Sequence, residues 1–259
     1  MWRASVPDTQ QIRLLKAARE KYDLAPLAIH SNYLINLASC SQELRSKSAE
    51  SFRSEMERGL EIGAEYLVVH PGNCKGHTVE QGIVALVQSL VEAASGLNTR
   101  GLMVLLENTA GSGEALGSRL EELALMRDCA LQVTELEVGF CIDTCHCHAS
   151  GYDVATAAGL KKTVAEIDRV LGIENVKVIH TNDSKTPFNS RVDRHENIGE
   201  GHIGEEGFRR ILNHPKLRSK PFILETPVDE EDDDRRNIET LKRLAAGGVT
   251  RSKPSRKRK

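Results

Sequence analysis

The chain has 259 residues, of which 39% are hydrophobic, so it is long enough and apolar enough to bury the core of one large domain. No apolar run approaches the roughly 20 residues of a membrane span, so we expect no membrane association. The start "MWRASVPDTQQIRLL" lacks the apolar region of a secretory signal, so we expect the six cysteines to be reduced. The formal net charge of −2 by itself argues against a nucleic-acid-binding protein.

Short apolar runs alternate with longer segments of mixed polarity along the chain. A helical segment at 8–21 comes first, and six runs that predict strands follow it: 26–30, 66–70, 103–107, 138–143, 176–180 and 222–225. Because these runs are apolar on both alternating faces, they are typical of parallel strands buried on two sides. The segments that predict the later helices are 42–62, 79–98, 116–128, 155–172, 205–213 and about 234–246. This alternation predicts an α/β fold with right-handed crossovers and helices on the outside.

Each of the six predicted strands ends at a residue of metal-ligand type. These residues are His30, His70, Glu107, Asp143, His180 and Glu225. One polar residue after an apolar strand means little, but six histidines and carboxylates in succession form a pattern. In a βα barrel the carboxyl ends of the strands converge on the face that carries the active site. We therefore expect all six side chains to meet around one pocket.

Three further candidates lie just beyond these strand ends. His146 follows Asp143 by three residues in "CIDTCHCH". Asp193 and His195 stand two residues apart in "VDRH", where an extended backbone points both side chains the same way. One tetrahedral zinc takes about four ligands, so nine candidates indicate two or three ions. Histidines and carboxylates without an obligatory thiolate favour Zn, Mn or Fe over a structural cysteine-rich zinc site.

Seven segments of the chain resemble one known family. They are "HSNYLINLAS", "VVHPGN", "LLENTAGSG", "CIDTCHCHASGYD", "HTNDSK", "SRVDRHENIGEGHIG" and "ILET". In this order, from Trp2 to about Glu225, the chain resembles endonuclease IV, the trinuclear-zinc apurinic/apyrimidinic (AP) endonuclease of DNA base excision repair. The resemblance implies a TIM-type (β/α)8 barrel of the xylose-isomerase-like class. It also implies hydrolysis of double-stranded DNA on the 5′ side of an abasic site, which leaves a 3′-hydroxyl, and it leaves open whether 3′-blocking groups are removed as well.

The resemblance also implies three Zn²⁺ ions per chain. The first would be held by His30, His70 and Glu107. The second would share Glu107 as a bridge and be completed by Asp143, His180 and Glu225. The third, which would ligate the scissile phosphate, would be held by His146, Asp193 and His195. Water between two ions about 3.5–4 Å apart becomes hydroxide near neutral pH, and Glu225 or Glu107 is expected to orient it as the nearest equivalent of a general base. Three Zn²⁺ would bring the formal charge from −2 to about +4, so the charge of the apo chain is a poor guide to DNA binding.

Loops after the predicted strands would meet the DNA. Tyr33 and Leu34 follow His30 at a loop tip and could enter the base stack beside a missing base. The alternative is that Leu34 belongs to the core of the next segment. Arg191 and Arg194 would bind phosphate beside the third zinc, or else be solvated loop arginines.

The cysteines near Asp143 are expected to pack rather than to bind metal. Cys141 shares the strand parity of Asp143, so we expect it in a barrel layer beneath the metal. Cys145 is expected to be a buried packing thiol, while Cys147 and His148 occupy positions where the family motif is tolerant. Because thiolates bind zinc well, a cysteine ligand remains an alternative.

The family barrel has eight strands, and about six are present in this chain. We expect one barrel domain over 1–246 that acts as a monomer, with open edges on the strands at 26–30 and 222–225, which would make it fold poorly alone and cut weakly. Residues 247–259 form a basic segment, "RSKPSRKRK" at its end, that predicts a disordered tail and a nuclear location, with the mitochondrion as the alternative.

Two other functions are compatible with much of this pattern. A sugar isomerase or epimerase on the xylose-isomerase-like barrel also places His, Glu and Asp at strand ends around Mn²⁺ or Mg²⁺, but it would not need the "VDRH" pair or nine ligands. A truncated, inactive remnant that binds damaged DNA would explain the absent strands, but it would not explain a complete ligand set.

Overall fold

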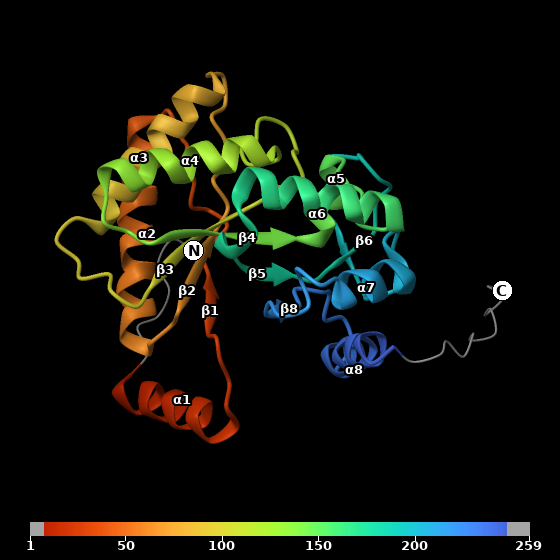
Figure 1. The fold of residues 1–259 in the computed structure, drawn as a ribbon. Helices are drawn as coiled ribbons and strands as arrows, with labels where there is room; N and C mark the ends of the chain where they lie inside the picture. Colours follow the sequence, from red (N-terminus) through yellow and green to blue (C-terminus); the bar gives the residue numbers. More distant parts are fainter. Residues whose placement is uncertain (1–7, 248–259) are drawn as a thin grey trace.

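Six short parallel strands form the central sheet of the protein, as the computed structural model describes for residues 8–247. In sheet order they are β1 (Ala28–His30), β2 (Tyr66–Val69), β3 (Met103–Glu107), β4 (Val138–Asp143), β5 (Val176–His180) and β8 (Phe222–Ile223). Each neighbouring pair is parallel. The sheet curves as part of a barrel with the helices outside it (Figure 1), so the predicted α/β barrel class and its six strands are confirmed.

The helices follow the predicted alternation. They are α1 (Thr9–Tyr22), α2 (Gln42–Ile62), α3 (Val79–Ala94), α4 (Leu120–Val133), α5 (Thr144–Ser150), α6 (Ala157–Leu171), the 3₁₀ turn η1 (Ile173–Asn175), α7 (Gly204–Asn213) and α8 (Asp233–Ala245). Four short elements were not predicted, namely α5, η1 and the two strands of an antiparallel hairpin, β6 (Asp183–Ser184) and β7 (His195–Glu196). The predicted strand at 222–225 is shorter than expected, because only its first two residues pair with β5.

Local sequence signals account for several of these boundaries. The hydroxyl of Thr78 accepts a hydrogen bond from the Gln81 amide, and the Gln81 side chain accepts one from the Thr78 amide, so a capping box starts α3. Gly63, at φ +75°, ends α2 in the left-handed conformation that glycine adopts without strain. Residues close in the sequence therefore determine where α2 ends and where α3 begins.

The sheet buries side chains on both faces. Its outer face packs against the helices in the main core, which includes Phe52, Phe140 and Phe208. Its inner face carries a smaller layer formed by Val68, Leu105, Cys141 and Val178. Cys141 therefore lies inside the barrel, as its parity with Asp143 predicted.

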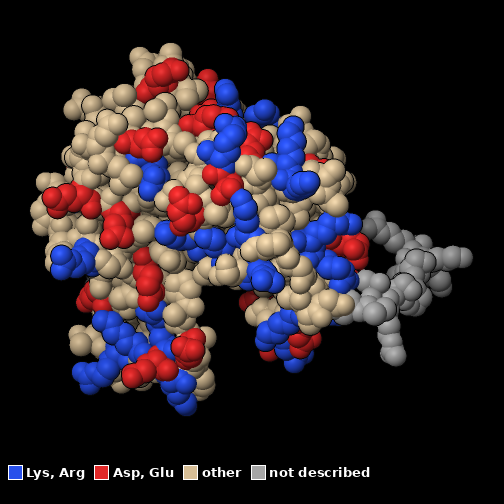
Figure 2. All heavy atoms as spheres, viewed as in Figure 1, with Lys and Arg blue, Asp and Glu red and all other residues tan. Residues whose placement is uncertain are grey.

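The two outer strands of the sheet, β1 and β8, have free edges within residues 8–247. Figure 2 shows an open notch between the part of the surface formed by α1 and the part formed by α8. Helix α1 buries little apolar surface, since Ile12 is its one buried residue. It is held instead by Arg19, whose guanidinium donates to the Gly63 carbonyl at 2.7 Å and to both carboxylate oxygens of Glu65.

None of the helices in the described part of the chain is long and apolar enough to cross a membrane. The basic tail from which we predicted a nuclear location lies, apart from Gly247, outside the described residues.

Candidate metal centre

Nine ligand-type side chains come together at the carboxyl ends of the strands. They come from the ends of β1 to β5, from α5, from the hairpin and from the segment after β8: His30, His70, Glu107, Asp143, His146, His180, Asp193, His195 and Glu225. These residues are far apart in the sequence, since His30 and Glu225 are separated by 195 positions. Their convergence follows from the parallel sheet, which brings the ends of all its strands to the same side.

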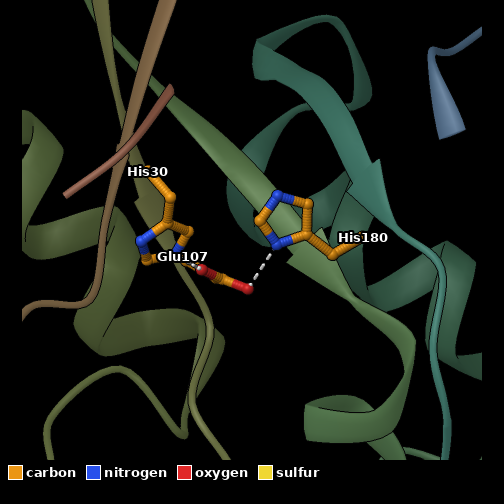
Figure 3. A group of neighbouring side chains, drawn as sticks. All are labelled: His30, Glu107 and His180. Carbon is orange, nitrogen blue, oxygen red and sulfur yellow. Dashed lines mark hydrogen bonds and ion pairs between the residues drawn. The ribbon is translucent and has the colours of Figure 1, made fainter. Parts of the chain in front are cut away.

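Glu107 lies at the centre of this cluster and is fully buried. One of its carboxylate oxygens, Oε2, lies 2.9 Å from His30 Nε2 and 3.0 Å from His70 Nε2. The other, Oε1, lies 2.7 Å from His180 Nδ1. Figure 3 shows the Glu107 carboxylate between His30 and His180. Two oxygens that face different histidines are the arrangement expected of a carboxylate that bridges two cations.

A second group of ligands forms around Asp193. The Oδ2 atom of Asp193 lies 3.1 Å from His146 Nε2, and its Oδ1 atom lies 3.4 Å from His195 Nε2. Asp193 stands in the loop before β7, and His195 starts that strand. The hairpin therefore carries two ligands to a point where His146 of α5 supplies a third, so the structure brings together the three residues expected to form the third site.

Hydrogen bonds to backbone carbonyls fix three of the histidine rings. The Nδ1 atoms of His30, His146 and His195 lie 2.9, 2.8 and 3.0 Å from the carbonyl oxygens of Ser31, Asn108 and Glu225. A carbonyl can only accept, so each Nδ1 carries the hydrogen and each Nε2 is directed into the cluster. Metal-binding histidines are commonly oriented in this way.

The carboxylates impose a negative field on the histidines. Burial by itself would lower the pKa of His146, but other contributions, led by the charge of Asp143, raise it to about 10. Burial also opposes protonation of His180, yet Glu107 outweighs it and raises that pKa. The Glu107 carboxyl would have a raised pKa from burial alone, but the charges of His180 and His70 hold it well below its usual value. A site that keeps its carboxylates ionised and draws protons to its histidines favours cations.

Two buried nitrogen atoms face a carboxylate without a hydrogen bond to it. The Nε2 atoms of His146 and His195 are buried and make no hydrogen bond, although oxygens of Asp193 lie 3.1 and 3.4 Å from them. A cation between these nitrogens and the carboxylate would satisfy both. One four-residue group also brings its ligand atoms within 4.8 Å of one another: Glu107, Asp143, His180 and Glu225. This nitrogen and oxygen donor set fits Zn²⁺.

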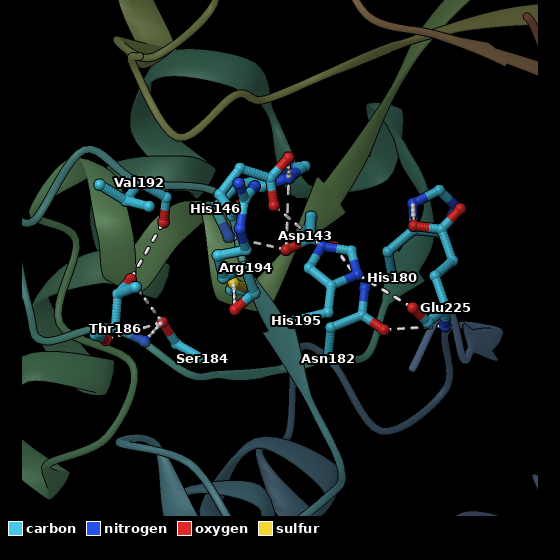
Figure 4. A network of polar contacts seen from close by, with 12 residues as sticks. Asp143, His146, His180, Asn182, Ser184, Thr186, Val192, Arg194, His195 and Glu225 are labelled. Carbon is cyan, nitrogen blue, oxygen red and sulfur yellow. Dashed lines mark hydrogen bonds and ion pairs between the residues drawn. The ribbon is translucent and has the colours of Figure 1, made fainter. Parts of the chain in front are cut away.

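Two asparagines in the cluster were not predicted as site residues. Asn108 and Asn182, which follow β3 and β5, are almost fully buried and hydrogen-bond to Asp143. Figure 4 shows Asn182 between Asp143 and Glu225. Asn108 directly follows Glu107, and Asn182 lies two residues after His180, so their position next to ligands at strand ends was a sequence signal. Nothing in the sequence indicated what the two side chains would contact.

His146 lies in a short helix that the sequence did not predict. Asp143 caps a short helix, α5, by accepting a hydrogen bond from the His146 amide at 2.7 Å, so both ligands are fixed by one helical turn. His148, at a position where the family motif is tolerant, is buried. Its ring stacks on His202 with centroids 6.4 Å apart and meets the edge of Phe188 at 5.5 Å.

The cysteines are poor candidates for ligands. Cys145 is close enough to Asp193 and His195 to share an ion with them. However, burial first and then the charge of Asp143 raise the pKa of its thiol to about 12, and its Sγ donates to the Arg194 carbonyl at 3.5 Å. Burial also raises the pKa of Cys141 to about 12. A protonated thiol is a weak ligand, so histidine and carboxylate ligands are favoured.

Thiol accessibility in the native protein follows from this burial. We expect the half-buried Cys40 and Cys129 to react with Ellman's reagent at pH 8, and the other four thiols to react only after unfolding in guanidinium. The measurement is the thiol count before and after denaturant is added. A third thiol that reacts within seconds in the folded protein would show that Cys74 or the region around β4 is open.

The four residues expected to contact DNA lie outside the cluster. Tyr33 is 88% exposed, while Leu34 is half-buried between Tyr33 and the buried Ile35. The half-buried state of Leu34 fits both a contact with DNA and a place in the core of the next segment. Arg191 and Arg194 are both exposed. Arg191 has a left-handed backbone at φ +56°, and its carbonyl accepts a hydrogen bond from the Ser112 hydroxyl at 2.6 Å, which joins the loop before β7 to the turn after β3.

Comparisons with known proteins identify the fold and the relatives of this chain. A model of the xylose isomerase-like TIM barrel family matches residues 2–244. A protein of Solibacter usitatus called "probable endonuclease 4" is 58% identical over 245 residues, which cover 95% of this chain and 84% of that protein. The crystal structure of endonuclease IV from Thermus thermophilus is 34% identical, with a TM-score of 0.82 over 96% of this chain and 86% of that one. A D-tagatose 3-epimerase-like protein, at 21% identity and a TM-score of 0.70 over 92% and 84% of the two chains, shares the fold.

Proposed function

Since this chain belongs to the endonuclease IV family within the xylose isomerase-like TIM barrels, we propose that it is a zinc-dependent AP endonuclease that hydrolyses the phosphodiester 5′ to an abasic site in double-stranded DNA. Family membership supports the coarser statement that it is a DNA repair endonuclease. The observation that carries the finer one is the set of nine histidines and carboxylates, centred on the buried Glu107, which exceeds the needs of one ion.

The nine residues would hold three zinc ions in overlapping groups. The first group is His30, His70 and Glu107. The second is Glu107, Asp143, His180 and Glu225, and the third is His146, Asp193 and His195. Bound zinc would lower the pKa of water and neutralise charge on the phosphate, which is what hydrolysis of a phosphodiester requires at neutral pH.

Glu225 is the carboxylate best suited to orient the attacking water. Its side chain is 30% exposed, whereas Glu107 is fully buried and contacts histidines through both oxygens. Burial would raise the pKa of Glu225, but the hydrogen bond and charge of His180 lower it, so the carboxylate stays ionised and can accept a hydrogen bond from water. Glu107 would then serve to hold the site together.

The exposed loop residues would bind the substrate around the lesion. Arg191 and Arg194 would neutralise phosphates next to the third group of ligands. Tyr33, at the tip of the loop after β1, would fill the space beside the missing base, and Leu34 would support it. These contacts favour DNA with an abasic site over a free sugar.

Incision of a duplex with a single abasic analogue tests the proposal. We expect cutting on the 5′ side of the lesion that is lost after prolonged treatment with a strong chelator and restored by Zn²⁺. His146→Ala and Asp143→Ala should each abolish cutting, and an undamaged duplex of the same sequence is the control. Cleavage that survives either substitution would contradict the assignment of the site.

Metal analysis separates the proposal from the two other functions. Close to three zinc ions per chain supports the endonuclease, while one or two Mn²⁺ or Mg²⁺ ions support a sugar isomerase or epimerase. Tight binding to abasic DNA without incision by the zinc-loaded chain would identify an inactive DNA-binding remnant. The monomeric state and the nuclear location stay predictions, to be measured by light scattering and by microscopy of a tagged chain.

A further inference from the structure

Asn108 and Asn182 hold Asp143 from opposite sides in the described structure. They follow β3 and β5, the two strands that flank β4, and Asp143 is the last residue of β4. All three residues are buried, with at most 2% of their surface exposed. We infer that these two asparagines, named here the asparagine clamp, are positioning residues that set how Asp143 and Glu225 present their oxygens to the metal centre. This inference rests on the proposed function only in taking Asp143 and Glu225 as metal ligands.

Asn108 fixes the backbone of Asp143. Its side-chain Oδ1 accepts a hydrogen bond from the Asp143 amide at 2.7 Å, and its Nδ2 donates to the Asp143 carbonyl at 3.2 Å. The backbone carbonyl of Asn108 also accepts the Nδ1 hydrogen of His146 at 2.8 Å. A single residue therefore fixes the main chain of one ligand and the ring orientation of the next.

Asn182 fixes the side chain of Asp143 and the backbone of Glu225. Its Nδ2 donates to Asp143 Oδ2 at 2.5 Å, and its Oδ1 accepts from the Glu225 amide at 2.8 Å (Figure 4). The positions of Nδ2 and Oδ1 in the Asn182 side chain follow from its partners, because a carboxylate can only accept and a backbone N–H can only donate. The hydrogen bond from Nδ2 uses one lone pair of Oδ2, and the bond from the His146 amide uses one lone pair of Oδ1, so each oxygen of Asp143 keeps one lone pair for a cation.

The effect of Asn182 extends to a third ligand. The Glu225 carbonyl accepts the Nδ1 hydrogen of His195 at 3.0 Å, so the residue whose amide Asn182 holds also sets the His195 ring. The Asn182 carbonyl in turn accepts from the Thr144 hydroxyl at 2.7 Å, which ties it to the start of α5. Asn182 thus connects residues from the second and third ligand groups, and its loss should loosen both.

Zinc retention tests the clamp without reference to DNA. We expect Asn182→Ala, in the full chain, to bind zinc about 10–100-fold more weakly than the unmodified protein does. The measurement is the loss of zinc from the loaded protein to a chelating dye. We also expect kcat for incision to fall by a similar factor while KM changes little, because the substrate-binding loops are untouched. Asn108→Ala should have the same direction of effect.

Thr181→Val is the matched control. Thr181 adjoins Asn182 and is equally buried, but its hydroxyl donates only to the Ile179 carbonyl at 3.2 Å and reaches no ligand. We expect this variant to retain zinc as the unmodified protein does. An equal loss of zinc in Thr181→Val and Asn182→Ala would show that the effect comes from general packing and not from the asparagine clamp. Full retention of zinc in a folded Asn182→Ala variant would overturn the inference.

The outcomes for the clamp and for the proposed function are distinct. If the unmodified protein binds zinc but cuts no abasic DNA, the proposed function fails while the zinc measurements still decide the clamp. If the unmodified protein binds no zinc, both inferences fail together, because the asparagines would then have no metal ligand to position.

Discussion

Replacement of Glu107 by glutamine is expected to lower kcat for incision by at least about a thousandfold, which corresponds to roughly 4 kcal/mol of transition-state stabilisation. Glutamine has nearly the same shape, so the fold should survive, and its neutral amide is less costly to bury than a carboxylate. It lacks the second anionic oxygen that would let one side chain bridge the His30 and His70 side of the cluster to the His180 side. Single-turnover incision and the zinc content per chain are the measurements.

Glu57→Gln is the control for the Glu107 experiment. It makes the same change of charge on α2, where Glu57 is half exposed and pairs with Arg53 of its own helix at 3.1 Å. We expect normal incision and normal zinc content in that variant. A Glu107→Gln protein that keeps its full zinc and cuts within tenfold of the unmodified rate would show that Glu107 does not bridge.

Replacement of Asp183 by alanine is expected to give the largest loss of stability among the polar residues near the site. The carboxylate of Asp183 is fully buried and accepts hydrogen bonds from the amides of Gly199, Gly201, Ile203 and Gly204 at 2.9 to 3.4 Å. Alanine leaves the Ile203 amide, which is buried, and the three glycine amides, which are partly buried, without this acceptor. Hydrogen bonds to a charged group are worth more than neutral ones, so we expect a loss of at least about 3 kcal/mol.

A thermal melt measures the effect of Asp183→Ala. For a domain of this size, a loss of that magnitude lowers Tm by about 6–12 °C. Asp128→Ala, at a site on α4 where the side chain is 66% exposed, removes the same charge and should leave Tm nearly unchanged. The backbone of Gly201 lies close to β6, because a Cβ atom added at Gly201 would lie 2.4 Å from the Ser184 carbonyl oxygen. An unchanged Tm in Asp183→Ala would mean that water replaces the carboxylate.

The position of the candidate metal centre could be predicted because its signal is local. Each predicted strand is a short apolar run that ends at one of the six expected ligands, so periodicity and adjacency are sufficient to find them. Parallel strands bring their carboxyl ends to one side whatever the details of packing, which explains why six separate predictions met in one cluster. The limits of the helices were predicted less well, since α4 starts and ends several residues later than 116–128.

The supporting residues could not be predicted because their partners are remote in the chain. Asn108 and Asn182 lie 35 and 39 positions from Asp143, and Asn182 lies 43 positions from Glu225. An asparagine side chain forms equally good hydrogen bonds with water, with its own turn or with a distant carboxylate, so residue type alone does not select among these partners. The sequence by itself determined which ligands meet and at which face. The tertiary structure alone decided how each ligand is aimed, because hydrogen-bond geometry depends on distances between strands that no local pattern encodes.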